Sequence, residues 1–283
     1  MTATRIPQPD QERTMTYTDT TYTETDVVAA IERLSGQPLT ALTPHQRDQL
    51  DQFHAGGPEA VQRILPDLRL APGMTVLDVG SGLGGPARQV AATTGCNVLG
   101  IDIAPAYVQA ARALTDAAGL ADRVRFLCTD LAALGPVTFD AAYTMHVQMN
   151  VADKRSFFAE IARRLRPGAR LAVFEVCRNR AAEPAAPLPW SLDGTDSFLA
   201  TPEELRRTIE FGGFELVDWA DETAWVRNWF EHAATRMAAA GTHATLPALL
   251  NNGPTRMMNF AAAIAADVVS IHSGSFTRAR DPR

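Results

Sequence analysis

Short apolar runs alternate with amphipathic segments through the middle of the chain. Apolar runs bounded by glycine, proline or polar residues are typical of strands buried on both faces of a sheet. They predict strands at 74–79, 97–103, 123–128, 139–145 and 169–177. Helical periodicity between them predicts helices that begin at residue 84 and that span 105–118 and 153–165. This alternation indicates an α/β fold, in which a parallel sheet carries helices on both faces.

Two further regions flank this alternation. Residues 1–24 are polar and aperiodic, which predicts a mobile arm, and 25–70 contains three short helical patterns. After the fifth strand the chain is rich in alanine and proline. The pattern that follows predicts a helix and then a sixth strand at 214–219. Two more helices are predicted within 221–267, before a last alternating strand at 268–276.

The whole pattern predicts one domain over 25–283, with its core at 74–220. The 283-residue chain has a net charge of −6, and this argues against duplex nucleic acid, which needs a basic face. No apolar run approaches the length of a membrane span, and the N-terminus lacks the apolar region of a secretory signal. The cysteines lack the spacing of a metal site, so we expect free thiols in a cytoplasmic protein and no bound metal.

The first predicted strand runs into a glycine-dense turn that contains Gly80, Ser81, Gly82 and Gly84. Glycines lack a Cβ atom, so a ligand can lie directly on this backbone, facing the first N–H groups of the next helix. Similar turns occur in nicotinamide, flavin and triphosphate-binding proteins, but no Lys-Ser or Lys-Thr pair follows here. Asp78 precedes the first glycine, where it would repel a pyrophosphate and attract an ammonium group.

A second acid, Asp102, follows the next apolar run. Folds of this kind place a carboxylate on the ribose hydroxyls about 20 residues beyond the glycine turn. A ribose joined to a cationic amino-acid tail describes S-adenosylmethionine. We therefore expect this compound as the cofactor and S-adenosylhomocysteine as its product.

With these motifs together, the chain resembles class I S-adenosylmethionine-dependent methyltransferases. Within that superfamily it is most similar to the sarcosine/dimethylglycine N-methyltransferase group, from about residue 51 to residue 275. The segments that carry the resemblance are 80–88, 100–103, 146–150 with 153–154, 165–168, 187–190 and 197–199.

The resemblance implies a Rossmann-like, seven-stranded, mostly parallel sheet whose last strand is antiparallel. It also implies that the helices of 25–70 form a lid over the cofactor and that 221–267 is a helical cap between the last two strands. We expect the lid helices to become ordered when the cofactor binds, because they have little else to bury against. The turn at 165–168 is expected only to close the preceding helix.

The resemblance also implies several roles at the cofactor. Ile103 belongs to the second motif, Asp130 accepts a hydrogen bond from the adenine amino group, and Leu131 packs against the ring. Asp130 is alternatively no more than a cap for the short helix that follows it. His146 ends the fourth strand, which points at the methyl group in this superfamily.

The candidates for catalysis are His146 and Glu175. Either would act as a base for a hydroxyl or C–H acceptor, while a neutral amine needs less help. His146 is alternatively a neutral wall of the pocket. Met149 and Asn150 follow His146 and are expected to line the acceptor site, together with Trp190 and Trp229. A methionine and aromatic stripe in the cap, which includes Trp229, is equally consistent with a core.

These residues favour transfer of a methyl group to a small-molecule amine. An O- or C-methyltransferase of secondary metabolism is the nearest alternative, because Met145 departs from the glutamine of the strict sarcosine/dimethylglycine pattern. A nicotinamide-dependent dehydrogenase and a non-catalytic binding module are more remote alternatives. An acidic acceptor would need an arginine, and Arg178, Arg227, Arg236 and Arg256 are equal candidates. The sequence leaves a monomer and a homodimer both open.

Overall fold

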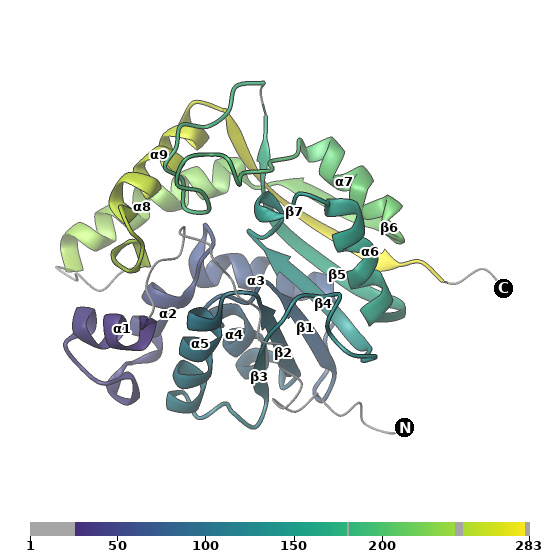
Figure 1. Cartoon of the computed structure of the whole chain (residues 1–283), viewed down its shortest axis with the longest axis horizontal. Coiled ribbons are helices and arrows are strands. Elements are labelled where there is room, and N and C mark those ends of the chain that lie inside the picture. The colour runs from purple at the N-terminus through teal and green to yellow at the C-terminus, as the bar shows by residue number, and fades with distance from the viewer. Residues whose placement is uncertain (1–25, 180, 241–245, 281–283) are drawn as a thin grey trace.

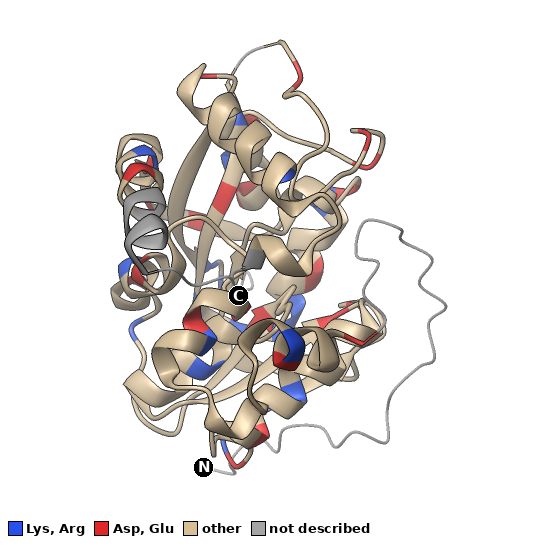
Figure 2. Ribbon diagram, turned by 90° about the vertical axis from the view of Figure 1, so that its left-hand side faces the viewer, with Lys and Arg blue, Asp and Glu red and all other residues tan. Residues whose placement is uncertain are grey.

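The computed structural model describes residues 26–179, 181–240 and 246–280, with the side chains of 233–240 and 246 left outside this description. The arm expected at 1–24 lies outside the described residues. Among the described residues, no helix has the length and apolar character needed to cross a membrane. On the side of the molecule shown in Figure 2, basic and acidic residues are interspersed over the helices and loops.

Seven strands form one sheet in the order β3-β2-β1-β4-β5-β7-β6, and β7 runs antiparallel to both of its neighbours. The other pairings are parallel, so the predicted topology is confirmed. The strands are β1 (Thr75–Val79), β2 (Asn97–Asp102), β3 (Val124–Cys128), β4 (Phe139–Met145), β5 (Leu165–Arg178), β6 (Phe214–Asp221) and β7 (Val269–Arg278).

Helices surround the sheet close to the positions that the periodicity predicts (Figure 1). The α-helices are α1 (Val27–Ser35), α2 (Pro44–Asp51), α3 (Gly57–Leu68), α4 (Gly85–Thr94), α5 (Pro105–Ala117), α6 (Lys154–Arg164), α7 (Pro202–Phe211), α8 (Thr223–Ala240) and α9 (Gly253–Ala265). Short 3₁₀ turns are η2 (Leu39–Ala41), η3 (Gln148–Asn150) and η4 (Leu246–Leu249).

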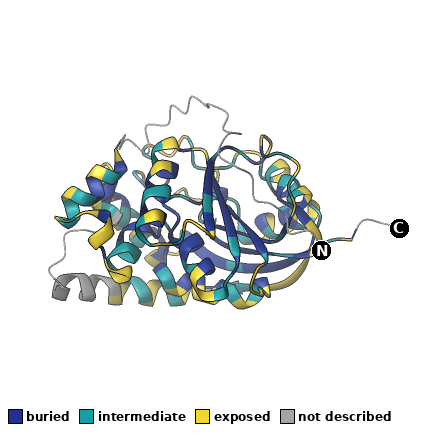
Figure 3. Ribbon diagram, turned by 90° about the horizontal axis from the view of Figure 1, so that it is seen from below, coloured by how far each residue is buried: buried dark blue, intermediate teal, exposed yellow. Residues whose placement is uncertain are grey.

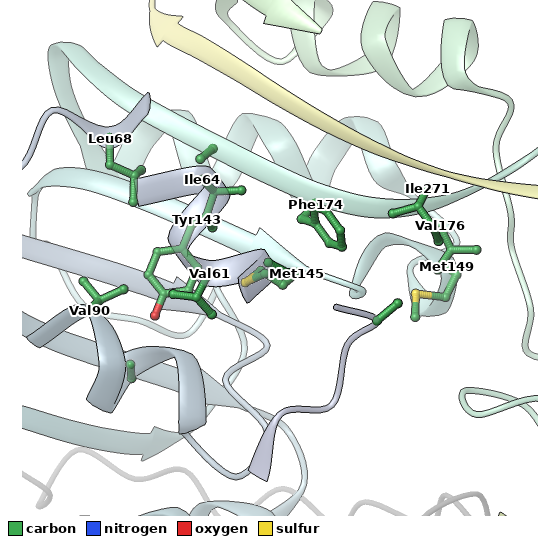
Figure 4. Close-up of a cluster of buried hydrophobic side chains, with 14 of the residues drawn as sticks. Val61, Ile64, Leu68, Val90, Tyr143, Met145, Met149, Phe174, Val176 and Ile271 are labelled. Atoms are coloured by element: carbon green, nitrogen blue, oxygen red, sulfur yellow. The ribbon is translucent and has the colours of Figure 1, made fainter. Parts of the chain in front are cut away.

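The apolar core lies on both faces of the sheet. On one face α3, α4, α5, α8 and α9 contribute to a buried cluster, and on the other α6 and α7 do so. Figure 3 shows the buried strands between partly exposed helices, and Figure 4 shows part of the first cluster, from Val61 of α3 to Met149 of η3. Strands buried on both faces explain why their sequence is apolar without alternation.

The N-terminal helices pack against the rest of the domain. Val27, Ala30 and Ile31 of α1 are buried in a cluster that also contains Tyr107 and Leu114 of α5. The expectation that these helices have little to bury against is therefore wrong. Alanines and apolar residues on the side of α5 that faces α1 provide the surface, which the sequence shows only as part of another helix.

The cap combines core residues with exposed ones. Phe260 of α9 is buried in the main cluster, and Trp225 of α8 packs against that cluster while Arg63 of α3 lies over its ring. Met258 is 64% exposed, so only one side of the methionine and aromatic stripe belongs to the core.

The turn at 165–168 has a different role from the one expected. β5 already begins at Leu165, which pairs with Phe139 before a bulge shifts the register to Ala141 and Arg170. The segment therefore starts a strand after α6 has ended, rather than forming a separate turn.

A buried ion pair joins α2 to α4. Nη2 of Arg88 lies 2.5 Å from Oδ2 of Asp51, and both side chains are almost completely buried. The same guanidinium donates to the carbonyl of Leu83 and, through Nη1, to Oγ1 of Thr115. Arg88 thus holds α2 and α5 around the start of α4, immediately after the glycine turn.

We expect Arg88→Met to lower the free energy of unfolding by about 3–5 kcal/mol, because Asp51 would remain as a buried charge without its partner. Urea denaturation of the ligand-free protein measures this loss. Arg123→Met is the matched control, since Arg123 is half-exposed and its nitrogen lies 3.7 Å from Asp122. The control should cost less than about 1 kcal/mol. Equal losses in the two variants would contradict a special role for the buried pair.

Candidate functional site

A cavity of about 440 Å³ lies at the carboxyl ends of β1, β2, β3 and β4. Its volume lies within the ordinary range of ligand pockets, about 300–1,000 Å³. The residues that line it are Phe53, Val79, Gly80, Gly82, Ile101, Asp102, Ile103, Ala104, Tyr107, Thr129, Asp130, Leu131, Ala132, Met145, His146, Val147, Met149, Asn150, Val151, Asp153, Ser156, Phe157, Glu160, Pro189 and Trp190.

The glycine turn forms the floor of the cavity. Gly80 has a φ of 76°, and a Cβ atom there would lie 2.5 Å from Cγ2 of Val147. Gly82 has a φ of 51° and faces open space, since a Cβ atom added there would meet nothing within 4 Å. Both positions favour glycine for their backbone conformation, and Gly80 also for its contact with the turn after β4.

Asp102 fastens this turn to the end of β2. Its Oδ2 accepts a hydrogen bond from the N–H of Gly82 (2.8 Å), and its Oδ1 accepts one from the N–H of Ala104 (2.9 Å). Burial raises the pKa of Asp102, while these N–H groups oppose the rise. A carboxylate oxygen has more than one lone pair, so both oxygens keep capacity for ribose hydroxyls.

Ile103, Asp130 and Leu131 lie together on the wall beyond Asp102. Oδ1 of Asp130 accepts a hydrogen bond from the N–H of Ala133 (2.7 Å), so the capping role left open by the sequence is present. Asp130 also lines the cavity, so the two roles do not exclude each other.

His146 follows β4 in a left-handed conformation, with a φ of 55°. Its ring stacks on Phe174 with the ring centres 5.8 Å apart, and His54 meets it edge-on at 6.2 Å. Burial, and then the neighbouring His54, lower the pKa of His146 well below its ordinary value. Burial also lowers the pKa of His54, to about 4. His146 and the histidine behind it are therefore neutral imidazoles near neutral pH.

Glu175 holds the turn that carries His146. Its Oε2 accepts hydrogen bonds from the N–H groups of Val147 (2.9 Å) and Gln148 (3.3 Å), and its Oε1 accepts one from Oγ1 of Thr144. The side chain is completely buried, and this burial raises its pKa to about 7. Glu175, a candidate base from the sequence, does not line the cavity, because its carboxyl group turns toward these backbone donors.

Met149, Asn150 and Trp190 form the opposite wall, as expected from the sequence. Nδ2 of Asn150 donates to the carbonyl of Trp190 (2.9 Å), which ties η3 to the proline-rich segment. Nε1 of Trp190 donates to Oγ of Ser197 (2.9 Å), and its ring meets Phe260 edge-on. Asn150 therefore serves this wall as a brace as well as a lining residue.

Asp78, Ser81 and Gly84, predicted to bind the cofactor, and Trp229, predicted to bind the acceptor, are not among the residues that line the cavity. Asp78 lies beneath the turn, paired in register with Tyr143, and burial raises its pKa to about 7. Ser81 and Gly84 shape the turn: the N–H of Ser81 donates to the carbonyl of Ile101, and Gly84 caps α4. Trp229 instead faces α3.

The position of Trp229 follows from one hydrogen bond. Its Nε1 donates to Oε2 of Glu59 (3.0 Å), which fixes α8 against the first turn of α3. The stripe of aromatic residues in the sequence does not distinguish this side of α8 from the side that faces the core.

Phe53 lies in the segment 25–70 that the resemblance assigns to a lid, whereas two other aromatic lining residues, Tyr107 and Phe157, were not predicted from the sequence. Phe53 and Tyr107 contribute neighbouring rings, with centres 5.2 Å apart, and Phe157 contributes a third from α6. Tyr107 lies in the first turn of the helix that follows Asp102, and this closeness in sequence could have predicted that it lines the same cavity. Among the described residues, no group of three or more histidine, cysteine or acidic side chains is arranged to hold a metal ion.

The order and directions of the strands are those of the class I S-adenosylmethionine-dependent methyltransferase fold. Residues 77–173 match the family model described as a methyltransferase domain, and this part of the chain is similar to that family. The matched region runs from β1 to β5, and it contains the glycine turn, Asp102, Asp130 and His146.

Named relatives support the same grouping. O-methyltransferase resE from Aspergillus sclerotiorum is 30% identical over 161 residues, which are 54% of this chain and 60% of that protein. The chain thus spans less than two thirds of the length of this curated relative. Other matches carry the names of sterol C-methyltransferases and of a phosphoethanolamine N-methyltransferase.

Solved structures share the fold. The cyclase SpnF has a TM-score of 0.65 and 23% identity, over 91% of this chain and 94% of that one. A putative sarcosine dimethylglycine methyltransferase structure from Galdieria sulphuraria has a TM-score of 0.63 and 15% identity, over 78% and 85% of the two chains. The resemblance to that group therefore extends to the fold.

We expect Glu175→Ala to destabilise the protein by about 2–5 kcal/mol, because an unsatisfied buried N–H costs about 1–3 kcal/mol and two would lose their acceptor. Glu175→Gln retains one oxygen for these N–H groups and should cost no more than about 1.5 kcal/mol. Urea denaturation compares the two variants. If Glu175→Gln lowers the free energy of unfolding as much as Glu175→Ala, then the charge of Glu175, rather than its hydrogen-bond acceptors, stabilises the turn.

Proposed function

We propose that this chain transfers the methyl group of S-adenosylmethionine to a small, uncharged and largely apolar molecule. One observation carries the proposal: a single continuous cavity joins the Asp102 carboxylate and the glycine turn to a wall of neutral His146, Met149 and Trp190. The first part suits a nucleoside with an amino-acid tail. The second suits an acceptor that brings no charge of its own.

The cofactor half fits its ligand by shape and charge. Asp102 is held by two backbone N–H groups and is preset to accept the ribose hydroxyls, while Ile103 and Leu131 offer an apolar slot for the base. Asp78 lies beneath the turn, and a bound ammonium group would favour its ionised form against the burial that raises its pKa to about 7. When bound, the cofactor would supply an electrophilic methyl group on a sulfonium centre.

The residues that line the cavity disfavour an acidic acceptor. No arginine of the described part of the chain lines the cavity. Arg227 donates to the carbonyl of Ile264, Arg256 to those of Leu188 and Pro189, and Arg178 pairs with Glu183. The side chain of Arg236 lies outside the described residues. An amino-acid carboxylate would therefore enter this cavity without a guanidinium from the described residues to meet it.

An amine nitrogen is the acceptor atom that needs least from these residues. Burial disfavours the ammonium form, so an apolar wall keeps the nitrogen neutral and nucleophilic. The chain then has to position the acceptor and exclude water, which can account for about 7–11 kcal/mol of a barrier. Met149 and Trp190, braced by Asn150, provide that positioning.

Oxygen or carbon is the second candidate, favoured by the O-methyltransferase and sterol C-methyltransferase names among the relatives. Such acceptors must lose a proton, and neutral His146 is a cavity residue able to take it. SpnF carries the same fold with a cyclase name, so fold alone does not require methyl transfer.

A panel of acceptors with isotope-labelled S-adenosylmethionine tests the proposal. We expect label transfer to hydrophobic amines or phenols, and none to sarcosine or dimethylglycine, because the described cavity offers no guanidinium to a carboxylate. The panel should contain each apolar amine next to its carboxylated analogue as a matched pair. Efficient methylation of the carboxylated member would contradict the assignment of an uncharged acceptor.

His146→Asn separates the two acceptor types, and asparagine tolerates the left-handed backbone at this position. With an amine, we expect kcat to fall less than about tenfold, since the side chain serves as a wall. With a hydroxyl or C–H acceptor the fall should be about 10²–10⁴-fold. Steady-state kinetics with intact cofactor affinity distinguishes these outcomes.

The pH profile gives a second readout of the same residue. An unperturbed imidazole would make the rate fall below about pH 6.5 if His146 is a base. Burial lowers the pKa of His146, so its neutral form persists below that value. We therefore expect no His146-dependent loss of rate as the pH falls from about 8 to about 6. A limb near the unperturbed value that vanishes in His146→Asn would contradict the buried, neutral imidazole.

A further inference from the structure

A second groove lies at the opposite end of the sheet. It has a volume of about 600 Å³ and is formed at the amino end of the parallel strands, where α3 ends and where β7 ends beside β5 (Figure 1). Its lining residues are Leu68, Arg69, Met74, Asp140, Gly168, Ala169, Arg170, Glu215, Thr277, Arg278 and Arg280. None of them lines the methyltransferase cavity, so the groove is a separate feature.

Positive charge dominates this groove. Four arginines line it, against two acids, in a chain whose net charge is −6. One of the acids, Asp140, is already engaged: it accepts hydrogen bonds from the N–H and Oγ1 of Thr75 and pairs with Arg166. The other acid, Glu215, is exposed at the rim. The groove therefore concentrates a positive potential on a protein that is negative as a whole.

Arg170 brings an unsatisfied buried donor to this groove. Its Nη1 is buried and has no hydrogen-bond partner among the described residues. Burial and the neighbouring charge of Arg69 both lower its pKa, and the charge of Asp67 opposes them. A buried donor without an acceptor, next to a like charge, is unfavourable unless an anion satisfies both.

We propose that this groove binds a small oxyanion with two or more negative charges, such as phosphate, pyrophosphate or a phosphate monoester. Arginine presents a planar fork of N–H donors that matches the oxygens of a phosphate group. Arg170 is partly buried, Arg69 and Arg280 stand exposed around it, and the concave shape favours a compact ligand. Since the groove is remote from the glycine turn, the proposal stands independently of methyl transfer.

Isothermal titration calorimetry and thermal denaturation of the full chain at low ionic strength test the site. The probes are inorganic phosphate, pyrophosphate, a phosphate monoester and sulfate, each without added cofactor. We expect saturable binding and a higher Tm with at least one phosphate probe. Stronger binding of the monoester than of inorganic phosphate would identify a metabolite as the source, and the reverse order would identify the free anion.

Arg170→Gln should weaken the binding at least tenfold. Arg280→Gln should also weaken the binding. Because Arg280 is exposed, this variant should fold normally and can test the site even if Arg170→Gln does not fold. Arg207→Gln on α7 is the matched control, because it removes one positive charge from a side chain that is 63% exposed and outside the groove. It should leave the affinity unchanged. No saturable binding of any probe, or equal weakening in all three variants, would overturn the proposal.

Discussion

The buried carboxyl group of Glu175 is the interaction on which the functional site depends. It accepts hydrogen bonds from the N–H groups of Val147 and Gln148, and so fixes the turn in which His146 adopts a left-handed conformation. Val147 in turn packs directly against the bare α-carbon of Gly80. A single acid therefore links the turn after β4 to the glycine turn after β1.

The cavity combines acidic and apolar lining residues. Asp102 and Asp130, whose carboxylates accept hydrogen bonds from backbone N–H groups, line it together with the neutral imidazole of His146, Met149 and Trp190, and Asp153 and Glu160 line it as well. In the function proposed above, the acids would attract the cationic tail of the cofactor, and the apolar residues would hold a neutral acceptor by burial of apolar surface.

The fold was predictable because strands buried on both faces leave uninterrupted apolar runs, and because the acid after each run marks the carboxyl edge of the sheet. The sequence alone therefore predicts that Asp102, Asp130 and His146 share one site, and all three line the same cavity.

The sequence did not predict which way certain side chains point, and this direction determines whether a residue lines the cavity. Glu175 turns toward backbone donors, and Trp229 turns toward Glu59. Neither direction is encoded in strand or helix periodicity, since each depends on contacts between elements distant in sequence. The packing of α1 against α5 was hidden for the same reason.

The central claim is that the cavity holds S-adenosylmethionine by the Asp102 carboxylate. Calorimetric titration of S-adenosylhomocysteine and of NAD into the wild type and into Asp102→Ala tests it most directly. We expect saturable binding of S-adenosylhomocysteine, an affinity at least about tenfold lower in Asp102→Ala through loss of charge-assisted hydrogen bonds, and no binding of NAD. Binding of NAD instead, or unchanged affinity for S-adenosylhomocysteine in Asp102→Ala, would contradict it.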